Sequence, residues 1–254
     1  GQKLVGTEYF TGYSGKVRFS GINFKGIQDS AITTSNNNII SDLDLNFDSY
    51  ADTISRLIQA NFKNVNLTNL DITHQVNGKL AGSTQGTLSI GKGGDVFING
   101  IVNIASDRSK SGVGINGSSS LIINKGAELN INITNDAWGG AILSNSSKID
   151  VYGKLNCISD KRMLLNGNVY AGNQLNIYEG AEVIFAKSSI SLYSSSDDRA
   201  NSMFIEKGAK IYINDNSSTK YLYTETDYLN ETEFRSMESD VREIIAILTF
   251  LFNV

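Results

Sequence analysis

Apolar residues recur in one short phrase through the middle of the chain. Four segments align without gaps on the pattern apolar-x-Ile-x-x-Gly-small-x-apolar-x-apolar, and they begin at Leu88, Leu121, Leu175 and Met203. A fifth, shorter copy surrounds Gly153. Apolar and polar residues alternate on both sides of the glycine, which indicates two short β-strands with one buried face each. The phrase therefore predicts a strand–bend–strand unit that the chain repeats.

The spacing of the copies indicates a solenoid. The central apolar residue falls at position 90, 123, 151, 177 or 205, so successive copies lie 33, 28, 26 and 28 residues apart. Repeats of this kind stack into a continuous core, because a single coil cannot bury its own apolar face. We expect the central residues to form one inward column, and the glycines to lie at the bend, where a positive φ avoids a Cβ clash. The central residues are Ile90, Ile123, Val151, Ile177 and Ile205, and the glycines are Gly93, Gly126, Gly153, Gly180 and Gly208.

The first third of the chain shows a weaker version of the pattern, at residues 17–24, 39–47 and 62–67. We expect further coils there. The sequence thus predicts an all-β protein in which residues 1–220 form a single parallel β-helix domain.

Residues 221–254 follow a different period. Apolar residues spaced by three and four predict an amphipathic helix after an acidic linker; they are Phe234, Met237, Val241, Ile244, Leu248 and Leu251. The helix would cover the exposed end of the solenoid, since such an end presents unpaired strand edges. The alternatives are self-association through the helix and a remnant of a membrane-proximal segment.

Charge and composition narrow the function. Residues 225–243 contain seven acidic residues and two arginines, a local charge of −5, which leaves +1 for the rest of a chain with a net charge of −4. No basic stripe is present, so nucleic acid is not an expected partner.

The longest apolar run, residues 244–252, is about half of the ~20 residues that span a bilayer, and membrane insertion is not expected. A single cysteine, Cys157, supports neither a disulfide nor a zinc site and is expected in the core. No cofactor is expected.

The string from Asn124 to Asn132, with its partial copies at residues 179–183 and 207–211, resembles the pectate-lyase-like adhesive domains of Gram-positive surface proteins. These include the binding regions of serine-rich-repeat adhesins and WxL-associated surface proteins. The resemblance covers about residues 85–215, and autotransporter passenger domains and phage tailspikes use a similar phrase. It implies a right-handed β-helix, a location at the cell surface or secreted, and adhesion to a host or environmental glycan or a matrix protein. It implies no catalytic residues.

The main alternative is an enzyme, a polysaccharide lyase or hydrolase, because pectin-degrading enzymes share this fold. The only histidine, His74, lacks the Gly-His-Gly context that polygalacturonases need. Asp197, Asp198 and Arg199 combine two acids and a base, but they lie in a polar run that is typical of a surface loop. We therefore expect a module without catalysis. A purely structural or phage-fibre role is a third alternative.

Aromatic residues are the candidate ligand contacts. The alignment places Phe97, Ile184 and Tyr212 at equivalent outward positions, and Trp138 in a glycine-flanked loop. Exposed rings in a row suit the stacking of sugars along the solenoid or a protein hot spot. Alternatively, long loops such as residues 186–202 bury them. The predicted ligand-binding residues are Trp138, Tyr152, Tyr178, Phe97 and Tyr212.

One further position recurs with the same residue type. Asn99, Asn132 and Asn214 close three copies of the phrase. We expect a structural role for them, an asparagine ladder in which amides of neighbouring coils bond to one another.

Overall fold

The computed structural model describes residues 16–17, 22–27, 30–34, 36–50, 56–77, 86–91, 93–107, 111–134, 141–159, 163–167, 173–186, 190–194, 202–215 and 218–223. These residues form strands and turns, and no helix occurs among them. The larger of two sheets contains β1 (Lys16–Val17), β2 (Ile22–Ile27), β4 (Ile39–Tyr50), β6 (Val65–Asn77), β8 (Asp95–Asp107), β10 (Ser120–Ile123), β11 (Glu128–Thr134), β13 (Lys148–Val151), β14 (Lys154–Ser159), β16 (Gln174–Ile177), β17 (Glu182–Ala186), β19 (Ser202–Ile205), β20 (Lys210–Asp215) and β21 (Ser218–Tyr223). The smaller contains β3 (Ser30–Thr33), β5 (Arg56–Ala60), β7 (Leu88–Ile90), β9 (Val113–Asn116), β12 (Ile142–Asn145), β15 (Met163–Gly167) and β18 (Ile190–Ser194).

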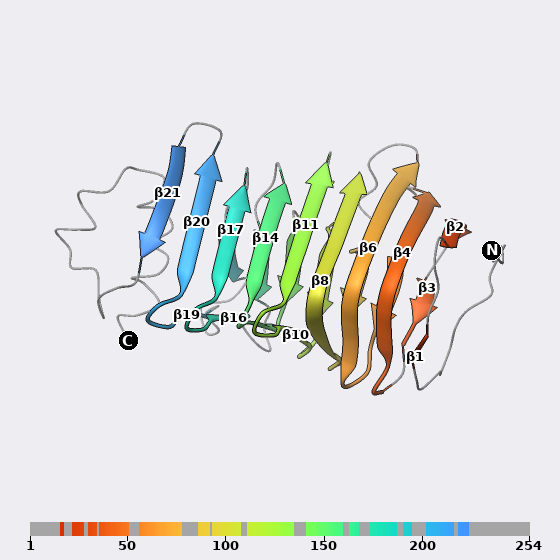
Figure 1. Cartoon of the computed structure of the whole chain (residues 1–254), viewed down its shortest axis with the longest axis horizontal. Coiled ribbons are helices and arrows are strands. Elements are labelled where there is room, and N and C mark those ends of the chain that lie inside the picture. Colours follow the sequence, from red (N-terminus) through yellow and green to blue (C-terminus); the bar gives the residue numbers. More distant parts are fainter. Residues whose placement is uncertain are drawn as a thin grey trace.

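The strands wind into a parallel β-solenoid, as the sequence predicts (Figure 1). Each coil adds one strand to the smaller sheet and then continues into the larger sheet. In the coils β9–β11, β12–β14, β15–β17 and β18–β20, a bend divides the second part into two strands. In β4, β6 and β8 a single long strand passes the same corner. The weak pattern in the first third of the chain therefore does mark coils.

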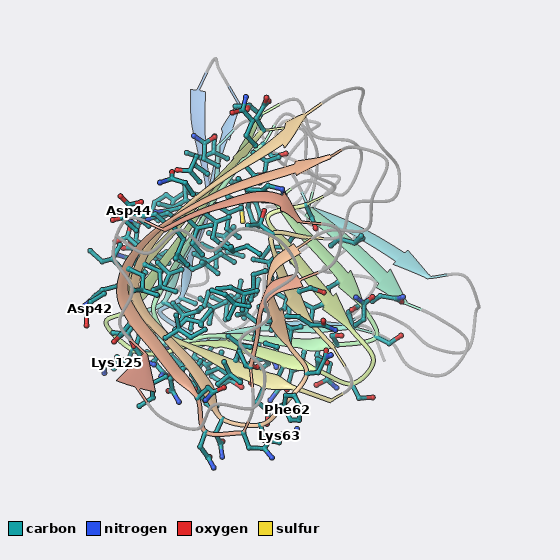
Figure 2. The ribbon with its side chains drawn as sticks, turned by 90° about the vertical axis from the view of Figure 1, so that its right-hand side faces the viewer. Asp42, Asp44, Phe62, Lys63 and Lys125 are labelled. Carbon is teal, nitrogen blue, oxygen red and sulfur yellow. The ribbon has the colours of Figure 1, made fainter. Side chains whose placement is uncertain are left out.

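Apolar side chains fill the interior of the solenoid (Figure 2). Ile123 pairs in register with Val151, Val151 with Ile177, and Ile177 with Ile205. The first three are fully buried and Ile205 packs against the same core. The predicted inward column is confirmed for these four residues.

The column continues toward the N-terminus through Ile98 and Leu67, and the assignment of Ile90 to it was wrong. Ile90 is buried, but it lies on β7 in the smaller sheet, where it pairs with Ala60 and Ile115. The copy that begins at Leu88 therefore lies one strand earlier around the coil than the other copies. Its first strand belongs to the smaller sheet, whereas theirs belong to the larger sheet.

A shared turn explains this misalignment. The amide of Ala127 bonds to the carbonyl of Asn124 at 2.9 Å, and the glycine between them, Gly126, has φ 77°. Gly94 bonds to Gly91 in the same way at 3.0 Å, and Gly93 has φ 72°. Both are four-residue turns with glycine third, the position that needs a positive φ in a type II turn. One turn leads from β7 to β8 and the other from β10 to β11, so equal turn chemistry occurs at two different corners.

Polar ladders follow the outside of the larger sheet, and of the three predicted rungs only Asn99 takes part in one. One ladder consists of Asp71, Asn103, Asn130 and Asn156, and each amide donates to the side-chain oxygen of the preceding coil. The predicted rungs Asn132 and Asn214 share a register column, yet Ile158 and Ala186 separate them. Asn99 bonds to Asn66 of the preceding coil and to Asn124 of the following one, so the predicted ladder is confirmed at this residue.

His74 is a buried side chain of the core. Its Nδ1 lies 2.7 Å from the Thr87 hydroxyl, and burial lowers its pKa from 6.5 to about 3.

Below pH 6.5 the His74 side chain of the unfolded chain binds a proton that the folded chain does not bind. Stability present above that pH is therefore lost as the pH falls toward the folded pKa. We expect a loss of about 2 kcal/mol between pH 7 and pH 5 from this residue. Urea denaturation at both pH values should show a smaller loss in His74→Gln, and an equal loss would contradict the assignment.

The C-terminal edge of the larger sheet carries the one antiparallel pair among the described strands, β20 with β21. β21 passes through residue 220, where the predicted solenoid domain ends. Residues 224–254, which contain the predicted amphipathic helix, lie outside the described residues, and the helix stays a prediction.

Candidate functional site

The bend between the two parts of the larger sheet has one irregular coil. Three coils use the four-residue turn, at residues 124–127, 178–181 and 206–209. In the coil β13–β14, Tyr152 and Gly153 alone connect the strands. The amide of Tyr152 bonds to the preceding coil at Ile123, and the amide of Lys154 bonds to Ala127. Tyr152 and Gly153 thus occupy the first and last positions of the turn, and the two middle residues are missing.

The missing residues leave a surface cleft, which we call the corner cleft. It has a volume of about 700 Å³. Residues of three successive coils line it: Lys125, Gly126, Ala127 and Glu128 on one side, Tyr152, Gly153 and Lys154 in the middle, and Glu179, Gly180 and Glu182 on the other side. Its floor is the coil whose turn is two residues shorter than those of both neighbours.

Charged side chains of alternating sign run along one edge of the cleft. Glu128, Lys154, Glu182 and Lys210 occupy one register column of four successive coils. Lys154 lies 3.5 Å from Glu128, and Lys210 lies 3.6 Å from Glu182. Both pairs are substantially solvent-exposed, so they add little stability. They do present carboxylate and ammonium groups at fixed intervals.

An aromatic ladder borders the other edge. The rings of Tyr152 and Tyr178 stack with a centroid distance of 4.0 Å and an interplanar angle of 7°. Phe204 follows, with its ring 6.2 Å from that of Tyr178 and tilted by 60°. Because Tyr178 of the next coil covers one face of Tyr152, the opposite face of Tyr152 is turned toward the coil of Asn124 and Lys125. Tyr152 is 38% exposed, and its ring is the aromatic wall of the cleft.

A buried carboxylate holds this ladder in place. Asp150 is 5% exposed and accepts hydrogen bonds from Asn176 at 2.8 Å and from the hydroxyl of Tyr178 at 3.2 Å. Lys148 neutralises it at 2.8 Å. A hydrogen bond with Tyr152, burial and the nearby Asp150 charge together raise the pKa of Tyr178. The hydrogen bond to Asp150 positions the Tyr178 hydroxyl beside the stacked rings.

The structure brings together two of the five predicted ligand contacts, Tyr152 and Tyr178. Phe97 is half-buried and pairs with Asn66 and Ile122. Tyr212 is half-buried and pairs with Ile184, as the alignment predicts. Phe97 does not lie in the column of Ile184 and Tyr212. It belongs to the copy that begins at Leu88, which lies one strand earlier around the coil.

Two other predictions fall on positions that the structure leaves undescribed. Trp138 lies outside the described residues, and so do Asp197, Asp198 and Arg199. Cys157 is fully buried in the core, as expected, and burial raises its pKa to about 12.

The sequence-based site lacked the charged residues of the corner cleft, such as Lys125, Glu128 and Glu179. The sequence did carry a signal for the cleft, the shortened copy around Gly153, because a coil with a shorter turn must be recessed between its neighbours.

Among the described residues, no group of three or more histidine, cysteine, aspartate or glutamate side chains is arranged to hold a metal ion.

A scan against protein-family models found no match for this sequence, and searches of curated proteins and of solved structures also found none. Within the described residues, no helix has the length and apolar character needed to cross a membrane.

Proposed function

We propose that this chain is a non-catalytic adhesive module of a bacterial cell surface, and that it binds a polysaccharide or glycan at the corner cleft and the aromatic ladder. The observation that carries the proposal is the exposed ring of Tyr152, stacked on Tyr178, in a cleft lined by charged side chains. The resemblance of the coil phrase to Gram-positive adhesive domains supports the location and the adhesive role.

The chemistry of the cleft suits a sugar. A pyranose ring has an apolar face that packs against an aromatic ring, and hydroxyl groups around its rim that need hydrogen-bond partners. Tyr152 supplies the ring, while Glu128, Lys154 and Glu182 supply acceptors and donors around it. Successive coils repeat every ~4.8 Å, so Tyr178 and Phe204 extend the apolar edge along the solenoid axis. A linear polymer could follow this edge.

An enzyme is the second candidate, and one observation favours it. Glu128 and Glu182 lie two coils apart on either side of Lys154, or about 9.5 Å by strand spacing. That separation is at the upper end of the range for inverting hydrolases, about 6.5–9.5 Å. Each carboxylate is also paired with a lysine. The ion pairs favour a structural use of these two residues over acid–base chemistry.

We further propose a right-handed solenoid, the sense that nearly all parallel crossovers adopt. For residues 221–254 we propose an amphipathic helix that covers the end of the solenoid or mediates self-association.

Replacing Tyr152 with alanine tests the proposed site. An array of plant, microbial and host glycans should give at least one ligand for the unaltered protein. Titration of that ligand should show a roughly threefold to tenfold weaker affinity in Tyr152→Ala, since an aromatic contact contributes about 0.5–1.5 kcal/mol. Tyr212→Ala is the matched control, because Tyr212 lies on β20 outside the cleft.

Three results would change the proposal. Equal affinity of the Tyr152→Ala variant would remove the cleft from the binding site. Release of reducing or unsaturated sugar ends that is lost in Glu128→Gln would establish the enzyme. Binding of a matrix protein by a chain that binds no glycan would replace the ligand class.

A further inference from the structure

The two sides of the corner cleft carry opposite charges without ion-pair partners. Lys125 and Glu179 are the second residues of the turns 124–127 and 178–181, and both side chains are exposed. Neither side chain forms an ion pair or hydrogen bond among the described residues, and only the backbone amide of Glu179 is engaged, by Glu206 at 2.9 Å. The other charged residues that line the cleft, Glu128, Lys154 and Glu182, are all paired.

The short turn keeps these two charges apart. In a regular coil, a residue equivalent to Lys125 would stand between the two turns, one coil from each. The coil of Tyr152 and Gly153 lacks that residue, so Lys125 and Glu179 face each other across the gap. Two coil steps separate their backbones by about 9.5 Å, and the two side chains form no ion pair with each other in the part of the chain that the structure describes. Figure 2 shows Lys125 at the outer surface of the bend.

We infer that the corner cleft selects a zwitterionic glycan segment, one that carries a carboxylate on one sugar and a free amine on the next. This inference rests on the proposed glycan-binding function and specifies its ligand class. The carboxylate of the glycan lies toward Lys125 and its amine toward Glu179, with the sugar ring against Tyr152 between them. The cleft thus has a cation at one end, an anion at the other and an apolar face in the middle.

The paired charges of the cleft do not alter this polarity. Glu128 with Lys154, and Glu182 with Lys210, each sum to zero. A purely anionic polymer would be repelled by Glu179 at one end of the cleft, and a purely cationic polymer would be repelled by Lys125 at the other end. Only a ligand with both signs satisfies both ends of the cleft.

Four forms of one tetrasaccharide test the inference on the full chain. The parent alternates glucosamine and glucuronic acid and is zwitterionic. N-acetylation leaves it anionic, reduction of the carboxyl groups leaves it cationic, and both changes make it neutral. We expect the zwitterionic form to bind about threefold more tightly than either singly charged form and about tenfold more tightly than the neutral one, the range of two exposed ion pairs.

Matched variants assign the preference to the two residues. Lys125→Gln should abolish the preference for the carboxylate, and Glu179→Gln should abolish the preference for the amine. Lys63→Gln is the control, since Lys63 is an exposed lysine that does not line the cleft. It should leave both preferences unchanged.

The outcomes separate this inference from the proposed function. Equal affinity for the four forms, or a preference that survives in both variants, overturns the charge selection. A lack of binding to all four forms, with a glycan from the array still dependent on Tyr152, overturns the charge selection and leaves the proposed function standing. A lack of binding to all four forms and to the whole array overturns both.

Discussion

Replacing Ile123 with aspartate is expected to lower the free energy of unfolding by about 3–5 kcal/mol, because it places an unpaired charge in the core. Ile123 is fully buried, and its register neighbours are Ile98 in the preceding coil and Val151 in the following one. Both neighbours are fully buried apolar residues. No described polar group of the column could hydrogen-bond to the new carboxylate.

Urea denaturation followed by far-ultraviolet circular dichroism measures this effect. Ile158→Asp is the matched control, because Ile158 is also on a strand of the larger sheet but is 39% exposed. It should change stability by about 0.5 kcal/mol or less. Similar denaturation midpoints for the two variants would contradict the assignment of inward and outward positions. Should Ile123→Asp fail to fold, Ile123→Ala should still lose about 2–5 kcal/mol, through the cavity that it creates.

The fold was predictable because two local signals agree in the coils whose turn contains a glycine. Alternation of apolar residues sets which face of a strand is buried, and the glycine turn sets where the strand ends. The alignment failed for the copy that begins at Leu88, where the same turn occurs one corner earlier. Local sequence specifies the turn but not the corner. The position of a strand around the coil depends on its pairing with strands 25–32 residues away.

The candidate site was predictable in part. Tyr152 and Tyr178 follow the inward residues Val151 and Ile177, so stacking of the coils brings their rings together. The cleft was not predicted, because it arises from a difference between three turns that are far apart in sequence. The charged residues form a site only because the stacking of the coils places Lys125 and Glu179 on either side of one shortened turn. The buried Asp150 was also missed, because an outward strand position does not reveal that Tyr178 folds over it.

Replacing Gly153 with alanine is expected to lower the free energy of unfolding by about 2–3 kcal/mol and to weaken ligand binding at the corner cleft. A Cβ atom at residue 153 would lie 2.3 Å from the carbonyl oxygen of Ala127 and 2.4 Å from that of Asn124. Both contacts are with backbone atoms, so no side-chain rotation can relieve them. The coil must move outward, and overpacking of this kind typically destabilises by about 1–3 kcal/mol. The same movement would raise the floor of the cleft under Tyr152.

Gly126→Ala separates this steric effect from the usual requirement for glycine at a positive φ. Gly126 has φ 77° and no atom within 4 Å of its added Cβ, whereas Gly153 is not among the glycines with a positive φ. The Gly126 variant should therefore lose only about 1–2 kcal/mol, through backbone strain. Urea denaturation and titration of the array-derived glycan would be measured on both variants. A smaller loss of stability in Gly153→Ala than in Gly126→Ala would show that the shortened turn has room for a side chain. The close packing of that turn against the preceding coil could then no longer explain the depth of the cleft.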